Sequence, residues 1–313
     1  MKAQSVDHSA AQSEAVGHIR GMIIMMMGVL LLPFTDAIGK WMSTMDNIPP
    51  ATVAFLRFAV QCALTFVILL AMGGISQFRT SHLTVNLVRG ALIGFTSLCF
   101  FMAIKYMSLA DATAIFFAEP LILTIMSAII LKEKIGWRRY CAVTVGLVGT
   151  LIVIQPSFEV FGAISLLPLL CAVSFATYLI LNRKYGVHEK PLVMQFYAGI
   201  GGGLTTAFAM LIASQTSVED FHFSLTLTPS ICLLIFLLGS VATVGHLMVV
   251  QAFKLAPASI LAPFQYLEIV TAVILGLLLF GDFPTPSKWL GIMIIIGSGI
   301  YVFMRERSIK LES

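Results

Sequence analysis

The sequence predicts an all-α membrane protein with ten transmembrane helices, arranged as two inverted repeats of five helices each. Of its 313 residues, 58% are hydrophobic and 11% are charged, whereas soluble domains carry about 25% charged residues because their surface faces water. Apolar runs of about 20 residues, the length that crosses a bilayer as a helix, recur along the whole chain. A stretch that leads into the fourth run also returns, in degenerate form, at the ninth.

The ten apolar runs are expected to be helices, because backbone groups surrounded by lipid must form their hydrogen bonds within the segment. The links between them are mostly short and contain Pro, Gly, Asn or charged residues. We place the spans at residues 19–41, 50–72, 83–104, 109–131, 137–154, 161–182, 191–213, 229–253, 258–280 and 287–304. The first repeat then covers residues 19–154 and the second residues 159–304. Residues 1–18 form a frayed polar tail, and residues 305–313 form a second tail.

The basic residues predict the orientation of these spans. If the N-terminus is cytoplasmic, the outer links hold only Lys40, Lys105 and Lys288. The inner links and tails hold a much larger set, namely Lys2, Arg20, Arg79, Lys132, Lys134, Arg138, Arg139, Arg183, Lys184, Lys190, Lys254, Arg305, Arg307 and Lys310. Because cytoplasmic links carry an excess of positive charge, both termini are expected on the cytoplasmic side.

The internal repeat relates residues 105–120, KYMSLADATAIFFAEP, to residues 254–269, KLAPASILAPFQYLEI, at an offset of 149 positions. The aligned pairs are Ala103 with Ala252, Lys105 with Lys254, Phe117 with Tyr266, Glu119 with Glu268 and Glu133 with Asp282. Each copy carries a lone glutamate in an apolar helix, where a carboxylate is costly. An odd number of helices per unit makes the second unit enter the membrane from the opposite side. Inverted repeats of this kind place a binding site near the bilayer midplane and predict alternating access.

Several classes of function are disfavoured by what the chain lacks. The five cysteines lie in apolar stretches without CxxC spacing, so neither a disulfide framework nor a zinc site is predicted. No long basic run indicates a nucleic-acid partner, and no motif indicates a cofactor. An intramembrane enzyme would need a catalytic arrangement such as HExxH, clustered aspartates or a Ser/His pair. A primary pump would carry a nucleotide-binding motif in the same chain.

Several motifs together resemble the EamA-type members of the drug/metabolite transporter superfamily, over about residues 21–304. They are Arg57-Phe58, Glu119-Pro120, Leu131-Lys132-Glu133-Lys134 and Tyr266-Leu267-Glu268. The resemblance implies a multi-pass carrier of the bacterial inner (cytoplasmic) membrane, in which spans one, three, four, six, eight and nine surround a cavity while five and ten are peripheral. The phrase PFTDAIGKW at residues 33–41 is similar to a branch that includes riboflavin importers. Ile269 replaces Pro120 in the second copy, so a proline kink there is expected only in the fourth span.

Glu119 and Glu268 lead the candidate substrate-binding residues. Phe116 precedes Glu119 by about one helical turn, and Phe264 and Gln265 precede Glu268 in the same way, so each carboxyl shares a helix face with an aromatic ring. Such a cavity would suit a planar heteroaromatic ligand, and a buried carboxyl could take up a proton during transport. The alternative is that each acid pairs with another helix as a structural contact.

Further candidates lie on other spans. Asp36 and Lys40 are four residues apart and can meet on one helix face, which favours an interfacial ion pair over a gate or ligand contact. Arg57 lies about two turns into its span and is expected to pair with Asp36 or Asp111, with ligand contact as the alternative. Gln251 and Gln265 are polar groups close to the repeated stretch, whereas His246 is expected to be a satisfied histidine. Asp111 is expected to cap its helix.

The glycines have a structural interpretation. Gly90 with Gly94, and Gly199 with Gly203, follow the spacing that lets helix backbones approach closely. A phosphate-binding loop would require a preceding strand and a soluble context.

Taken together, these features favour a secondary transporter of a small organic metabolite, driven by the gradient of the substrate or of a coupled ion. Riboflavin uptake is the leading expectation, and export of drugs, amino acids or other metabolites is the alternative. The inverted repeat with acids near the midplane disfavours an open channel or a passive scaffold. The expected partners are the small-molecule substrate and the lipid bilayer.

Overall fold

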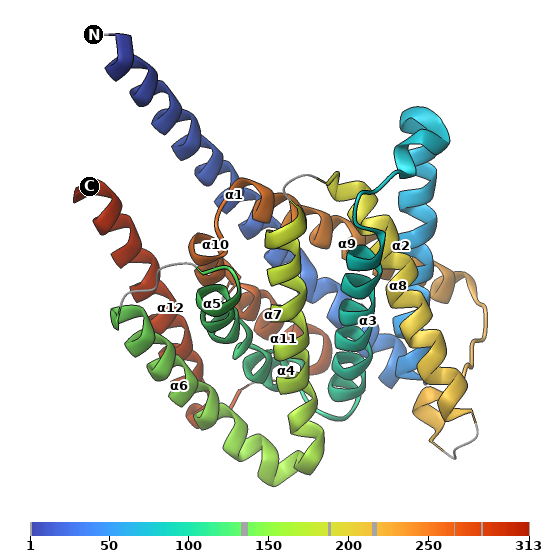
Figure 1. The fold of residues 1–313 in the computed structure, drawn as a ribbon. Helices are drawn as coiled ribbons and strands as arrows, with labels where there is room; N and C mark the ends of the chain where they lie inside the picture. Colours follow the sequence, from blue (N-terminus) through green and yellow to red (C-terminus); the bar gives the residue numbers. More distant parts are fainter. Residues whose placement is uncertain are drawn as a thin grey trace.

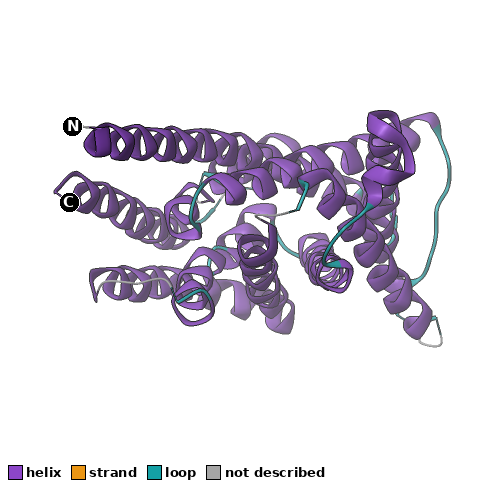
Figure 2. Ribbon diagram, turned by 45° about the horizontal axis from the view of Figure 1, so that its top comes forward, coloured by secondary structure: helices purple, strands orange, loops and turns teal. Residues whose placement is uncertain are grey.

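The computed structural model describes residues 2–132, 137–186, 189–214, 218–265, 267–282 and 284–312. Over these residues every regular element is a helix (Figure 2). The α-helices are α1 (Lys2–Thr44), α2 (Pro50–Gly73), α3 (Leu83–Tyr106), α4 (Leu109–Phe116), α5 (Glu119–Ile130), α6 (Trp137–Phe161), α7 (Leu167–Tyr185), α8 (Pro191–Ala213), α9 (Pro229–Leu255), α10 (Ala258–Gln265), α11 (Glu268–Phe280) and α12 (Pro286–Glu312). Short 3-10 helices lie at η1 (Gly74–Phe78), η2 (Gly162–Leu166) and η4 (Glu219–Phe221).

Seven helical segments of the described chain are long and apolar enough to cross a membrane. They contain most of spans one to four and six to eight, which supports the prediction of a polytopic membrane protein. The remaining spans are also helical, as α6, α10 with α11, and α12, and the count of ten membrane crossings stays a prediction. The prediction of a frayed N-terminal tail was wrong, because α1 begins at Lys2. The sequence before Gly17 contains no glycine or proline that would interrupt a helix.

The helix boundaries repeat at the same offset of 149 positions that relates the two sequence copies. Helix α3 ends at Tyr106 and α9 ends at Leu255. Helix α4 corresponds to α10 in both of its boundaries, and α5 and α11 begin at Glu119 and Glu268. The fourth and ninth spans are therefore each interrupted directly before their glutamate.

The interruption does not depend on Pro120. Tighter hydrogen bonds of the 3-10 type mark both breaks, from Ala118 N to Ile115 O at 3.2 Å and from Leu267 N to Phe264 O at 3.1 Å. Ile269 occupies the position of Pro120 in the second copy, and the helix breaks there as well. Each glutamate thereby lies in the first turn of a new helix, where the exposed amides and the helix dipole favour a negative charge.

The helices pack into a bundle with a peripheral pair at one edge (Figure 1). The most extensive contacts join α1 to α9, α3 to α8, and α6 to α12. A contiguous apolar core fills the space among α1, α2, α3, α4, α7, α9 and α11. Helices α6 and α12, the fifth and tenth predicted spans, lie side by side at the edge of the bundle, as the family resemblance implied.

Close backbone contacts hold α3 against α8. A Cβ atom added to Gly90 would lie 2.6 Å from the carbonyl oxygen of Ala198, and one added to Gly201 would lie 2.4 Å from that of Leu87. Gly94 meets Gly202 in the same way. The prediction that Gly203 lies at a close contact between helices was wrong, because a Cβ atom added there would lie 3.8 Å from its nearest neighbour. Three consecutive glycines begin at Gly201, and the helix turn decides which of them face α3.

Gly201→Ala is expected to destabilise the protein by about 1–3 kcal/mol, because the methyl group has no space and the backbones must separate. Gly203→Ala, two positions along the same helix, is the matched control and should leave stability nearly unchanged. The measurement is the thermal unfolding midpoint of each purified variant in detergent. Equal midpoints for the two variants would mean that the α3–α8 contact does not limit stability.

Candidate functional site

A small cavity lies between helices of the two halves of the chain. Its volume is about 60 Å³. It is lined by Leu32, Thr35 and Asp36 of α1, Arg57 of α2, Ile93, Thr96, Ser97, Phe100 and Phe101 of α3, Phe116 of α4, Phe175 of α7, His246 of α9 and Glu268 of α11. These helices are the six spans that the family resemblance implied, with the addition of α2, which contributes Arg57.

Acidic and basic groups share this cavity. Asp36 and Glu268 interact electrostatically with each other, and Asp36 also interacts with Arg57. His246 lies within electrostatic range of Arg57 as well. Four of the expected substrate-binding residues, Asp36, Arg57, Phe116 and Glu268, are therefore brought to one cavity by four different helices.

Arg57 uses only part of its hydrogen-bonding capacity. Its side chain donates to the hydroxyl of Ser97, and its guanidinium carbon lies 4.8 Å from the ring centre of Phe58. The Nε atom is buried and has no hydrogen-bond partner. Among the ion pairs of the described residues none involves Arg57, so the expected direct pair with Asp36 or Asp111 is not formed.

Aromatic rings form one wall of the cavity. The ring of Phe116 lies 5.7 Å from that of Phe100 and 5.6 Å from that of Phe175. Tyr178 stacks on Phe175 at 5.5 Å, and His246 meets the Tyr178 ring edge-on. Spacings of this size are typical of attractive ring pairs, so the wall is preformed.

Glu119 is buried and does not line the cavity. Its side chain is only 1% exposed, and its Oε1 atom has no hydrogen-bond partner. It interacts electrostatically with Glu268. The two repeated glutamates are thus neighbours, but only Glu268 lines the cavity.

Three further expected residues lie outside the cavity lining. Gln265 is buried with an unpartnered Nε2, Phe264 packs against the apolar core, and Gln251 is partly exposed on α9. The offset of 149 positions explains the difference between the two halves, because it aligns Phe116 with Gln265. Phe264 corresponds to Ile115, which is fully buried in the core.

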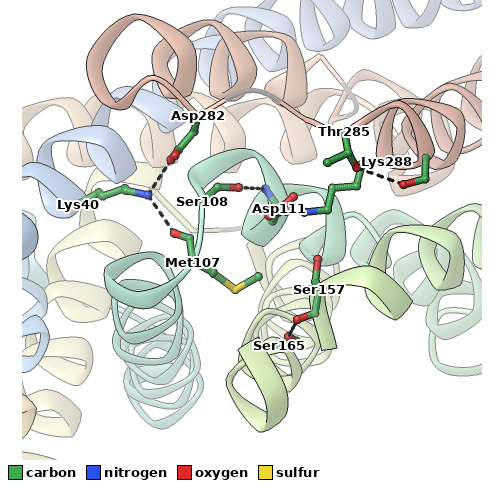
Figure 3. Close-up of polar contacts among 10 residues, drawn as sticks. Lys40, Met107, Ser108, Asp111, Ser157, Ser165, Asp282, Thr285 and Lys288 are labelled. Carbon is green, nitrogen blue, oxygen red and sulfur yellow. Dashed lines mark hydrogen bonds and ion pairs between the residues drawn. The ribbon is translucent and has the colours of Figure 1, made fainter. Parts of the chain in front are cut away.

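One end of the bundle, here called the Lys40 end, is closed by charged contacts (Figure 3). The Lys40 amine lies 2.9 Å from a carboxylate oxygen of Asp282 and donates to the carbonyl of Met107 at 2.9 Å. The expected ion pair between Lys40 and Asp36 was therefore wrong. Packing of α1 against α11 offers Lys40 a partner that local helix spacing cannot reveal, and Asp36 is left facing the cavity.

A second ion pair at the Lys40 end joins α4 to α12 (Figure 3). The Lys288 amine lies 2.7 Å from a carboxylate oxygen of Asp111. The N-cap of α4 is Ser108, whose hydroxyl accepts a hydrogen bond from the amide of Asp111 at 3.0 Å. The expected capping role thus belongs to Ser108, while the Asp111 side chain fixes the neighbouring helix. On α3, Lys105 pairs with Asp220.

The opposite end, here called the Arg89 end, is closed by a buried polar network. Arg89 is fully buried, donates to the amide oxygens of Asn182 and Asn86, and lies over the ring of Tyr178. Nearer the surface, the Glu189 carboxylate accepts from the backbone amide of Ser81 at 2.7 Å and from the hydroxyl of Thr80 at 2.9 Å. Lys254 donates to the Glu189 carbonyl at 2.8 Å. Polar and charged contacts thus tie the helices together at both ends of the bundle.

The cavity is small compared with known ligand sites. Pockets for drug-sized molecules span roughly 300–1,000 Å³, whereas a volume of about 60 Å³ accommodates a few water molecules. The cavity of this structure is therefore smaller than a metabolite of that size. A metabolite would enter only after one end opens and the walls move apart.

His246 is the clearest residue that sequence reasoning missed. It is 6% exposed, lines the cavity and has an unpartnered Nδ1 atom, whereas a lone histidine was expected to be satisfied. The repeat held a signal for it, because the offset of 149 positions aligns His246 with Ser97, which also lines the cavity.

Over the described residues, the helical bundle with seven helices long and apolar enough to cross a membrane is consistent with a polytopic membrane protein. The sequence pattern of the EamA-like transporter family matches residues 19–155 and again residues 162–304. The chain belongs to this family.

Relatives with assigned names are transporters. A protein of Rickettsia prowazekii named S-adenosylmethionine uptake transporter is 28% identical over 93% of this chain and 94% of its own length. Its counterpart in Rickettsia bellii is 30% identical over 87% of this chain and 89% of its own length. A riboflavin transporter of Vibrio cholerae is 26% identical over 92% and 94%. A crystal structure of a protein 19% identical shares the fold, with a TM-score of 0.69 over 92% of this chain and 98% of that one.

Proposed function

We propose that this protein imports S-adenosylmethionine across the bacterial cytoplasmic membrane. The observation that carries the proposal is the combination, in one cavity, of two carboxyl groups and a wall of aromatic rings. S-adenosylmethionine presents a permanently charged sulfonium and a flat adenine. Carboxylates and aromatic faces are the groups that bind organic cations in proteins.

Riboflavin is the second candidate substrate. The rings of Phe100, Phe116 and Phe175 would suit its flat ring system, and a riboflavin transporter is among the relatives. Riboflavin is uncharged, however, and offers no counterpart for Asp36, Glu268 and Arg57. The charge of the cavity therefore favours S-adenosylmethionine over the substrate expected from the sequence. The names of both groups of relatives favour transport, and those of the Rickettsia proteins favour uptake over export.

The mechanism that we propose is alternating access between two inverted five-helix units with ten membrane crossings. The matching boundaries of α3 with α9, α4 with α10, and α5 with α11 support the two units. The distribution of basic residues supports an extracytoplasmic Lys40 end and cytoplasmic termini. With both ends closed in one conformation, import requires the Lys40 end and the Arg89 end to open in turn.

The test is uptake of radiolabelled S-adenosylmethionine into proteoliposomes that contain the purified protein. Time-dependent accumulation is expected, with at least about ten-fold stronger competition by unlabelled S-adenosylmethionine than by riboflavin, because a charge-assisted contact contributes about 1.5–3 kcal/mol. Uptake of labelled riboflavin with no uptake of S-adenosylmethionine would assign the second candidate. Empty liposomes and heat-treated proteoliposomes provide the background.

A further inference from the structure

We propose that Arg57 and Asp36 form a subsite for the α-amino-carboxylate group of the substrate, with Arg57 binding the carboxylate and Asp36 the ammonium. The inference rests on the proposed uptake of S-adenosylmethionine and deepens it, because it assigns the amino-acid end of the ligand to one wall of the cavity. Neither residue alone would suffice, since a charged side chain within a membrane span can also pair with another helix as a structural contact.

Arg57 has spare donors that face the cavity. The side chain is 4% exposed, and its hydrogen bond to Ser97 uses one terminal nitrogen. Its Nε atom is buried without a partner. A guanidinium presents five N–H donors in a planar fork that matches the two oxygens of a carboxylate. A buried guanidinium without an ion-pair partner is costly, so a carboxylate that arrives with the ligand would relieve this cost.

Asp36 is placed to complement that fork. It projects from α1 into the same cavity and is within electrostatic range of Arg57. Lys40, one helical turn away, forms an ion pair with Asp282, so the Asp36 carboxyl keeps its capacity to accept hydrogen bonds. Thr35, beside it, also lines the cavity with a buried and unpartnered hydroxyl. An ammonium group donates three hydrogen bonds and would satisfy acceptors of this kind.

The positions of Arg57 and Asp36 on two different helices indicate which class of ligand would bind. A donor fork on α2 and a carboxyl on α1, both with unused capacity, match a group in which a carboxylate and an ammonium share one carbon atom. The aromatic wall then receives the remainder of the molecule, and Glu268 lies beside Phe116 for its positive centre. Riboflavin contains neither an ammonium nor a carboxylate and would leave this subsite empty.

The experiment compares S-adenosylmethionine with a ligand that lacks only the carboxylate and with a neutral thioether that lacks the sulfonium charge and the whole amino-acid chain. The thermal unfolding midpoint of the purified protein is measured against increasing S-adenosylmethionine, decarboxylated S-adenosylmethionine and 5′-methylthioadenosine, alongside uptake by proteoliposomes. S-adenosylmethionine should stabilise the wild type at a concentration at least about ten-fold lower than the decarboxylated compound, because the lost contact is charge-assisted. Arg57→Met should abolish that preference, and Arg57→Lys should keep only part of it.

Arg79, an exposed arginine that follows η1 outside the cavity, provides the matched control: Arg79→Met should retain the full preference. Equal stabilisation of the wild type by all three ligands would overturn the subsite, and so would an Arg57→Met variant that weakens all of them equally. If S-adenosylmethionine binds with the predicted dependence on its carboxylate but is not transported, the subsite stands and the proposed function fails. The ligand comparison on the wild type keeps the test decisive even if Arg57→Met does not fold.

Discussion

Replacing Glu268 with glutamine is expected to lower the initial rate of S-adenosylmethionine uptake by at least about ten-fold, through a higher half-maximal concentration, because a charge-assisted contact is lost. Glutamine keeps the size and shape of the side chain, so the cavity and the first turn of α11 should persist. What changes is the ionisable carboxyl that lines the cavity within electrostatic range of Asp36. Uptake by proteoliposomes at several substrate concentrations gives the two kinetic parameters separately.

The same substitution at Glu219, an exposed acid in η4, controls for the loss of one negative charge and should have no effect on uptake. Glu119→Gln is an informative comparison, because Glu119 is next to Glu268 but does not line the cavity. It is expected to change the half-maximal concentration less than Glu268→Gln does. An unchanged rate in Glu268→Gln would mean that this acid is structural and that the substrate is held elsewhere.

Breaking the ion pair between Lys40 and Asp282 should lower the stability of the protein by an amount that depends on which of the two residues is replaced. The Lys40 side chain is 9% exposed and that of Asp282 is 28% exposed. Asp282→Asn leaves a buried ammonium without its carboxylate, beside the Met107 carbonyl and the Phe280 ring, whereas Lys40→Met leaves a carboxylate that is partly hydrated. Since a stranded buried charge is the larger penalty, Asp282→Asn should lower the unfolding midpoint more than Lys40→Met.

The double variant provides the decisive comparison for this pair. If the two side chains stabilise each other, the losses of unfolding free energy in the two single variants, added together, should exceed the loss in the double variant by about 1–3 kcal/mol. Chemical unfolding of the purified variants in detergent measures these values. Additive effects would show that the two residues act independently and that the Lys40 end is held closed by other contacts, among them the pair of Lys288 with Asp111.

The sequence was most informative where lipid imposes the structure. Apolar runs must be helical in a membrane, and the offset of 149 positions found from Lys105 and Glu119 also relates the helix boundaries. Kinks were expected at Pro120 in the fourth span and at Pro263 in the ninth, but an interruption directly before each glutamate was not predicted. Ile269 shows that the break belongs to the repeated backbone geometry and not to one proline.

Contacts between distant helices were beyond the reach of sequence spacing. The rule that residues four apart meet on a helix suggested Asp36 as the partner of Lys40, whereas tertiary packing supplies Asp282, 242 positions away. The same limit applies to the cavity wall. Phe264 was chosen because it precedes Glu268, but its helical phase matches that of Ile115 and directs it to the core.

The most direct test of the central claim, that the cavity binds the transported metabolite, is substrate protection of a cysteine placed in its wall. Thr35→Cys is introduced into a variant whose five native cysteines are replaced, and its alkylation by a maleimide is followed in proteoliposomes after uptake activity is verified. Phe223→Cys, on an exposed side chain outside the cavity lining, serves as the control. S-adenosylmethionine is predicted to slow alkylation at position 35 and leave position 223 unchanged. Equal alkylation rates at position 35 with and without saturating substrate would contradict the claim.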